Sequence, residues 1–223
     1  MDNYSDELIK SVASDETSRF FEYYAISGLD GLINQIINNN ITDNVPIIKT
    51  IVGVSKGVIS IRDRNYLKKI FKFLFQTNKV SEKTKTKFKE KLKSKPDEVN
   101  KAGEAVWEIL DNISSSEKAP MIGKVFEAYM NDDISVDQLI YLSEMIDKAY
   151  LYDLLSIEQG RIQNRVNLIN VGVYEPVNYK QMIDDDYAIT SKGLTPSSHH
   201  MQNTSLTTEG RLLVSILTMT TKI

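Results

Sequence analysis

The chain of 223 residues has no cysteine, only two histidines and a single tryptophan. The absence of cysteine excludes disulfides, thiolate metal sites and a cysteine nucleophile, and it suits a reducing compartment. His199 and His200 are adjacent, so in a loop or strand their side chains point apart and do not converge on one metal ion. No nucleophile can be paired with a base, and we expect no catalytic, cofactor-binding or metal-binding residues.

A secretion signal and a long apolar run are missing as well. Residues 1–21 carry acids where a secretory signal carries basic residues, and they lack its apolar core. The most apolar window, residues 45–61, holds 17 residues including Lys49 and Lys56, whereas a membrane-spanning helix needs about 20 mainly apolar residues. We therefore expect a cytoplasmic protein. A membrane-acting effector that uses residues 45–75 is an alternative, because interfacial and re-entrant segments exist.

Basic and acidic residues are separated along the chain. From Arg62 to Lys95 there are thirteen Lys or Arg and three acids, a net charge of +10, and the remainder holds 14 bases and 27 acids, a net charge of −13. Such a chain offers a basic surface to an anionic partner, or its two parts face each other within one molecule or across a dimer.

The dominant spacing of apolar residues is helical. Intervals of three and four over most of residues 1–158 predict consecutive amphipathic helices, and Ser94-x-x-Asp97 and Ser135-x-x-Gln138 have the form of helix starts. From Pro46 to Phe75 there is no further proline, which predicts one long helix or a broken pair.

Two glycines interrupt the most apolar part of that stretch, IVGVSKGVISIRDR. A helix that is apolar over most of its circumference is buried, and small residues one turn apart let a second helix approach closely. We therefore expect Gly53 and Gly57 to lie at a tight helix contact inside the protein.

The Lys-rich segment that follows has two interpretations. Its lysines include Lys83, Lys85, Lys87, Lys89, Lys91 and Lys93, which leave Thr84, Phe88 and Leu92 as a thin packing seam. These lysines form either a solvated helix surface or a basic surface for nucleic acid or anionic lipid. Because no arginine or aromatic residue is interleaved, we expect any nucleic-acid binding to be weak and non-specific.

The composition changes after Gly160. Residues 166–177 and 186–190 have a strand-like composition, and the chain closes with an apolar helix pattern that includes Leu212, Leu213, Ile216 and Leu217. We therefore predict a mainly α protein, with a helical domain over residues 1–158 and a small α+β module over residues 159–223.

The last sixty or so residues resemble the closing part of a winged-helix domain. The resemblance places Arg161, Asn164, Arg165 and Asn167 near a recognition surface and the wing between residues 179 and 205. Asp184, Asp185 and Asp186 fall in that wing and would repel DNA phosphate, so the resemblance implies a protein contact. The same three acids are an unfavourable cation site because consecutive acids are usually solvated.

The middle of the chain, KGVISIRDRNYLKKIFKFLF followed by SEKAPMIGKVFEAYMNDDISVDQL, resembles a poorly characterised group of bacterial proteins carried near phage and mobile-element genes. The resemblance covers residues 45–155 and implies a phage-defence or mobile-element context without indicating any chemistry.

Taken together, these patterns predict a non-catalytic interaction protein that works through protein contacts or self-association. A membrane-acting effector and a nucleic-acid-binding protein are the alternatives. Tyr150 and Tyr152, like Tyr23 and Tyr24, are a further possible site, although aromatic residues at helical spacing are typical of a core.

Overall fold

The computed structural model describes residues 4–24, 31, 45–54, 60–161, 166–176 and 204–219. Within these residues the chain forms eleven α-helices, one short 3-10 helix and a two-stranded antiparallel sheet. The predicted mainly helical fold is therefore confirmed, and Gly57 and Asp184–Asp186 lie outside the described residues.

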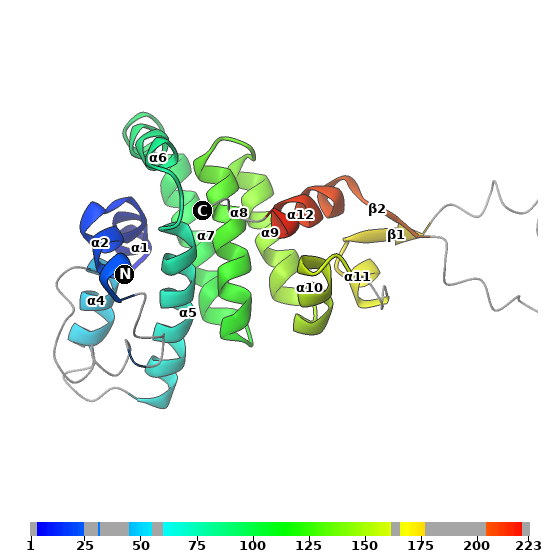
Figure 1. Ribbon diagram of the computed structural model, residues 1–223, viewed down its shortest axis with the longest axis horizontal. Helices are drawn as coiled ribbons and strands as arrows, with labels where there is room; N and C mark the ends of the chain where they lie inside the picture. Colours follow the sequence, from blue (N-terminus) through cyan, green and yellow to red (C-terminus); the bar gives the residue numbers. More distant parts are fainter. Residues whose placement is uncertain are drawn as a thin grey trace, which may run out of the picture.

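The first part of the chain comprises α1 (Tyr4–Ala13), α2 (Asp15–Tyr24), α4 (Pro46–Val54), α5 (Ile61–Thr77) and α6 (Glu82–Ser94). The middle comprises α7 (Pro96–Asn112), η1 (Ser116–Lys118), α8 (Ala119–Met130), α9 (Val136–Lys148) and α10 (Leu151–Glu158). The last part comprises α11 (Val166–Asn170), β1 (Tyr174–Pro176), β2 (Thr204–Leu206) and α12 (Thr208–Thr218). From α7 to α11 the helices follow one another in chain order across the molecule, and α12 returns to pack beside α8 and α10 (Figure 1).

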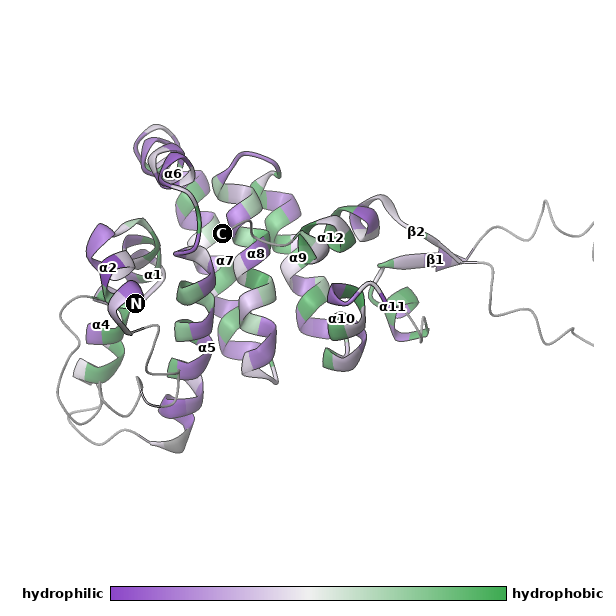
Figure 2. Ribbon diagram, in the orientation of Figure 1, coloured by the Kyte–Doolittle hydropathy of each residue, from purple (hydrophilic) through white to green (hydrophobic). Residues whose placement is uncertain are grey.

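The core is centred on the packing of α5 against α8. Phe73 of α5 and Phe88 of α6 both contact Phe126 of α8 edge to face, with ring centroids 5.5 and 5.6 Å apart. All three rings are fully buried, and such pairs stabilise a core beyond the area that they bury. Figure 2 shows that α8 contains many hydrophobic residues, in green, whereas α6 is mostly hydrophilic.

Within the described residues, two close helix contacts are made at Gly123 and Gly103. A Cβ built on Gly123 of α8 would lie 2.8 Å from Gln76 Cβ and 3.2 Å from Phe73 O, and one on Gly103 of α7 would lie 2.7 Å from Ile9 Cγ1. These positions require glycine because the facing helix leaves no room for a side chain.

The predicted tight contact at Gly53 is wrong as far as the described helices are concerned. Gly53 is exposed, and no described atom lies within 4 Å of a Cβ built on it. The physical reason is that α4 packs on the core through Ile47, Ile48, Ile51 and Val52, and Gly53 lies on its uncovered side.

The apolar stretch forms a broken pair of helices. α4 ends at Val54, and α5 starts at Ile61 behind a capping box in which Ser60 Oγ accepts from Asp63 N at 3.1 Å and Asp63 Oδ2 accepts from Ser60 N at 3.0 Å. In the part of the chain that the structure describes, no helix is both long enough and apolar enough to cross a membrane.

Of the two predicted helix starts, one is confirmed and one is wrong. Ser135 and Gln138 form the full capping box of α9. Ser94 instead ends α6, donating its hydroxyl to Glu90 O, while Lys95 is the N-cap of α7 and Pro96 its first residue. Proline suits a first helical turn, where its missing N–H has no partner to lose.

The C-terminal region combines a correct and a wrong prediction. Residues 174–176 do form a strand, and Tyr174, Glu175 and Pro176 pair with Leu206, Ser205 and Thr204. Residues 166–170, predicted as strand, instead form α11, and the predicted strand at 186–190 lies outside the described residues.

The predicted final helix is confirmed as α12, which buries Leu213, Ile216 and Leu217 against α8 and α10. A Cβ built on its Gly210 would lie 1.9 Å from Val173 O, so α12 also packs directly on the Val173 backbone. Buried residues on both sides of the predicted boundary at residue 158 belong to one cluster. The division into two domains and the winged-helix resemblance remain predictions.

Candidate functional site

The six lysines of the predicted basic surface do not lie on one surface. Lys83 and Lys93 are exposed, whereas Lys85 and Lys91 are buried and Lys87 and Lys89 are half-buried. The sequence predicts that α6 packs through Thr84, Phe88 and Leu92. In the structure Thr84 and Phe88 are buried as predicted, and Lys85 and Lys91 are buried with them. The expectation of a fully solvated lysine surface is wrong for these two side chains.

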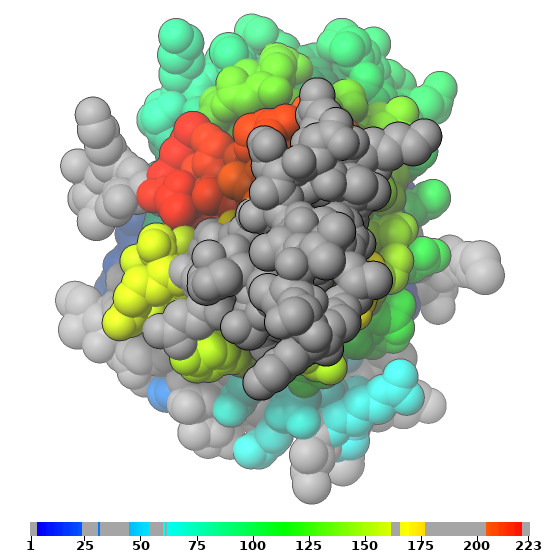
Figure 3. Space-filling view, turned by 90° about the vertical axis from the view of Figure 1, so that its right-hand side faces the viewer, coloured from blue at the N-terminus to red at the C-terminus, as the bar shows by residue number. Residues whose placement is uncertain are grey.

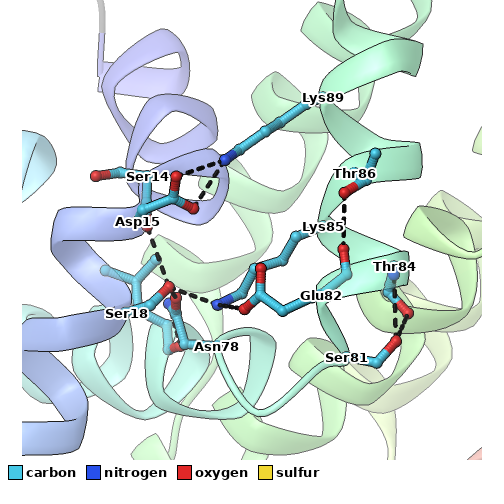
Figure 4. Close-up of polar contacts among 11 residues, drawn as sticks. Ser14, Asp15, Ser18, Asn78, Ser81, Glu82, Thr84, Lys85, Thr86 and Lys89 are labelled. Atoms are coloured by element: carbon cyan, nitrogen blue, oxygen red, sulfur yellow. Dashed lines mark hydrogen bonds and ion pairs between the residues drawn. The ribbon is translucent and has the colours of Figure 1, made fainter.

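A polar network joins α6 to α2 and to the end of α5 (Figure 4). Asn78 Nδ2 donates to Leu74 O at 2.8 Å, which fixes Asn78 Oδ1 as an acceptor, and Ser18 Oγ lies 2.6 Å from that oxygen. Lys85 Nζ lies 2.7 Å from Ser18 Oγ. Since the serine proton is donated to Asn78 Oδ1 or to Ser14 O, which lies 3.1 Å from Ser18 Oγ, the lysine donates to the serine.

The direction of these hydrogen bonds decides what the Ser18–Lys85 pair can do. A serine next to a lysine resembles a nucleophile and its base, but a base must accept the serine proton. Here Lys85 acts as a donor to Ser18, and Glu82 Oε1 lies 3.6 Å from Lys85 Nζ. The arrangement binds α2 to α6 and is not organised to activate the hydroxyl.

Lys89 and Asp15 form a second contact between the same two helices. Lys89 Nζ lies 2.7 and 2.9 Å from the two carboxylate oxygens of Asp15. This hydrogen bond lowers the pKa of Asp15. One lysine of the basic part of the chain is thus paired with an acid near the N-terminus of the same molecule.

A third lysine junction joins α6 to the end of α8. Lys91 Nζ donates to Tyr129 O at 2.7 Å, lies 2.6 Å from Asp132 Oδ1 and stands 4.0 Å from the centroid of the Tyr129 ring. Nearby, Lys87 Nζ donates to Asn131 O at 3.2 Å. Four of the six lysines are therefore engaged in contacts within the chain, which leaves Lys83 and Lys93 as the accessible basic residues of this set.

Metal binding finds no support in the described residues, where no group of three or more His, Asp or Glu side chains could hold an ion. His199, His200 and the three consecutive acids lie outside that part of the chain.

Most of the large apolar side chains that are exposed in the described residues come from α9, α10, α11 and the turn before α10. Eight large hydrophobic side chains are exposed in the described residues, and five of them lie between residues 141 and 166. We call these five the tyrosine face: Tyr141, Tyr150, Tyr152, Leu155 and Val166. Figure 3 looks onto the end of the molecule that carries α10 and α11 and shows both helices at the surface.

Three observations place the residues of the tyrosine face. Tyr150 N donates to Asn167 Oδ1 at 2.8 Å, which fixes the start of α10 beside α11 and its neighbouring Val166. Tyr152 and Leu155 are three residues apart on α10 and so share a helix face. The hydroxyl of Tyr141 lies 3.1 Å from a Cβ built on Gly172, just after α11.

The expectation that these tyrosines belong to the core is wrong. Tyr150 is 67% exposed and Tyr152 is 65% exposed, and Tyr23 in α2 is 77% exposed. The reason is local, because α10 buries Leu154 and Ile157 through its other face.

The winged-helix resemblance singled out four residues. Arg161 is exposed, and Asn167 accepts a hydrogen bond from the first turn of α10. Residues 164 and 165 lie outside the described part of the chain.

No protein-family model matches this chain, and neither the curated proteins nor the solved structures include a significant match to it.

Proposed function

We propose that this chain is a non-catalytic interaction protein that binds another protein through the tyrosine face. The observation that carries the proposal is that five of the eight large apolar side chains exposed in the described residues come from α9, α11 and α10 with its N-cap Tyr150. Scattered surface hydrophobics are normal, whereas a group of them marks an interaction site. Tyrosine is also enriched in protein interfaces, because it supplies a large apolar area and a polar tip.

The lysine junctions support a scaffold role for the rest of the molecule. Lys85, Lys89 and Lys91 each bind an acceptor from another helix, so α6 is committed to the fold and is not free to follow a nucleic-acid backbone. A protein contact at the tyrosine face therefore accounts for more of the geometry than a polyanion contact at α6 does. The phage-linked context remains a proposal that rests on sequence resemblance.

The proposal is tested by placing a photoreactive benzophenone side chain at two exposed tyrosines. In cells that naturally produce the chain, the group at Tyr152 should give a discrete crosslinked protein, and the group at Tyr23 should not, because only the first position lies in the tyrosine face. Equal crosslinking from both positions, or none from Tyr152, would contradict the proposal.

A further inference from the structure

The strand β2 and the helix α12 form one segment that docks on the rest of the molecule in a defined position. We call residues 204–218 the C-terminal segment. Its Thr207 donates from the backbone N–H to Val173 O at 3.1 Å and from the hydroxyl to Gly172 O at 2.7 Å. A Cβ built on Gly210 would lie 1.9 Å from Val173 O, so α12 meets the backbone next to β1 without a side chain between them.

Further contacts extend along α12. Its buried side chains pack against α8 and α10 and include Leu213, Ile216 and Leu217. Lys124 of α8 donates to Leu217 O at 2.8 Å, and its Nζ lies 2.9 Å from Glu158 Oε1 of α10. All the partners of the C-terminal segment in these contacts precede residue 177.

The chain connection between the C-terminal segment and these partners is long. Pro176 and Thr204 are directly opposite each other in the sheet, whereas residues 177–203 separate them in the sequence. A stretch of this length spans up to roughly 90 Å when it is fully extended. The covalent connection therefore does not restrict the C-terminal segment to partners in its own chain.

Docking on a second copy of the chain would keep every contact described above, because the second copy presents the same residues. Exchange of an identical segment is for this reason a low-cost route to a dimer. The protein concentration decides between the two arrangements. A segment held by a flexible linker has an effective concentration in roughly the millimolar range, so docking between copies competes at protein concentrations of that order.

We propose that two copies of this chain form a dimer by exchanging their C-terminal segments. Each α12 docks on α8 and α10 of the other copy, and each β2 pairs with the β1 of the other copy. The inference adds a second interaction surface to that of the proposed function. It does not depend on the tyrosine face, since none of the contacts described above involves its five residues.

The test uses two single variants of the full-length chain, which has no cysteine of its own. Glu175 of β1 and Ser205 of β2 are directly opposite each other, so thiols at these positions can form a disulfide across the sheet. Chains with Glu175→Cys and chains with Ser205→Cys are mixed at about 1 mM under reducing conditions, then diluted and oxidised at once. The proposal predicts more covalent heterodimer than the two homodimers together, because only exchanged segments bring the two thiols face to face.

A matched pair of variants measures the disulfides that form by random collision. Lys101 of α7 and Asp137 of α9 also face each other, with Nζ and Oδ1 2.7 Å apart, but neither belongs to the C-terminal segment. Chains with Lys101→Cys and chains with Asp137→Cys, treated in the same way, should give only the statistical share of heterodimer. A heterodimer share from the Glu175→Cys and Ser205→Cys mixture that is no larger than this control overturns the proposal.

A double variant provides a second, independent measurement. Glu175→Cys and Ser205→Cys in one chain, oxidised while dilute, should form an internal disulfide that holds the C-terminal segment on its own chain. Light scattering at about 1 mM should then show a dimer for wild type and a monomer for the oxidised double variant. The proposal is rejected if wild type stays monomeric, if both proteins dimerise equally, or if the internal disulfide does not form.

Discussion

Lys91 and Asp132 form an ion pair with 2.6 Å between Nζ and Oδ1, at a turn where Asp132 has a φ of 64°. This left-handed conformation is unfavourable for residues other than glycine, asparagine and aspartate. The lysine therefore stabilises the turn between α8 and α9 while its own charge is satisfied in a buried position. The same side chain fixes α6 to the core through Tyr129 O.

Removing the Lys91 ammonium should destabilise the protein. Lys91→Met keeps the length of the side chain but removes both the hydrogen bond to Tyr129 O and the ion pair with Asp132, so we expect a loss of about 1–3 kcal/mol in the free energy of unfolding. Urea unfolding measures it. Lys93→Met, on the exposed side of the same helix, serves as the control and should change stability by less than about 0.5 kcal/mol. Equal effects of the two changes would show that the junction contributes nothing.

The charge of Asp132 should make stability depend on pH in acid. The hydrogen bond from Lys91 lowers the pKa of Asp132 below its ordinary value of 3.8, so the folded state favours the ionised form. This contribution is present above the unfolded-state pKa and is lost as the pH falls through the lower folded-state pKa. Asp132→Asn retains a residue that tolerates a positive φ.

Accordingly, Asp132→Asn should be less stable than wild type at pH 7, and the difference should shrink below about pH 4. Thermal unfolding across this range provides the measurement. A difference that stays constant down to the lowest pH would mean that the charge of Asp132 is not involved.

Asp153 should show the opposite behaviour. Because burial raises its pKa, the folded state resists ionisation, and stability is lost as the pH rises from the unfolded-state pKa through the folded-state pKa. Asp153→Asn should therefore be more stable than wild type at pH 7, and this gain should disappear in acid, where both side chains are neutral. Urea unfolding of wild type and Asp153→Asn, measured at pH 7 and again in acid, compares their stabilities. A destabilised variant at pH 7 would indicate that Asp153 has a stabilising partner.

Gly123 and Gly53 should respond differently to alanine. A Cβ at Gly123 would meet Gln76 and the Phe73 carbonyl, so Gly123→Ala should cost about 1–3 kcal/mol. Gly53→Ala should be neutral or stabilising by up to about 1 kcal/mol, because alanine favours a helix and the position is open. The midpoints of urea unfolding, measured where the dependence of the free energy on urea is unchanged, give both values. A larger loss of stability for Gly53→Ala than for Gly123→Ala would contradict the helix contacts described above.

Nucleic-acid binding should be weak and depend on the two accessible lysines. Lys83→Gln with Lys93→Gln should remove most of a salt-sensitive, sequence-independent affinity, since each lost phosphate contact reduces the slope of binding against salt by about one. Fluorescence anisotropy with two unrelated DNA sequences tests this. Sequence-specific binding that persists at physiological salt would favour the nucleic-acid alternative.

The sequence predicts most of the helices because their packing is periodic. The capping box at Ser135 and the apolar face of α12 depend on residues three or four apart, which a local pattern contains. The lysine junctions could not be found in this way, since Ser18 and Lys85 are 67 residues apart and alternate lysines normally indicate solvent. Only the placement of α2 beside α6 turns Lys85 into a buried donor.

Two other features depend on which neighbours the fold supplies. Residues 166–170 have a strand-like composition, but Asn167 binds the first turn of α10 and the segment forms a helix. Gly53 and Gly123 both occur in apolar helices, and only the position of α5 decides which of them needs to be glycine. The tyrosine face was missed for the same reason, because helical spacing alone does not say whether Tyr150 and Tyr152 meet a neighbour.

The most direct test of the proposed function is hydroxyl-radical footprinting of the wild-type chain, both purified and in the cells that produce it. The proposal predicts that Tyr150 and Tyr152 are oxidised readily in the purified protein and are protected in cells, while Tyr23 is oxidised equally in both. Equal oxidation of Tyr150 and Tyr152 in the two samples would contradict the proposal that the tyrosine face binds a protein.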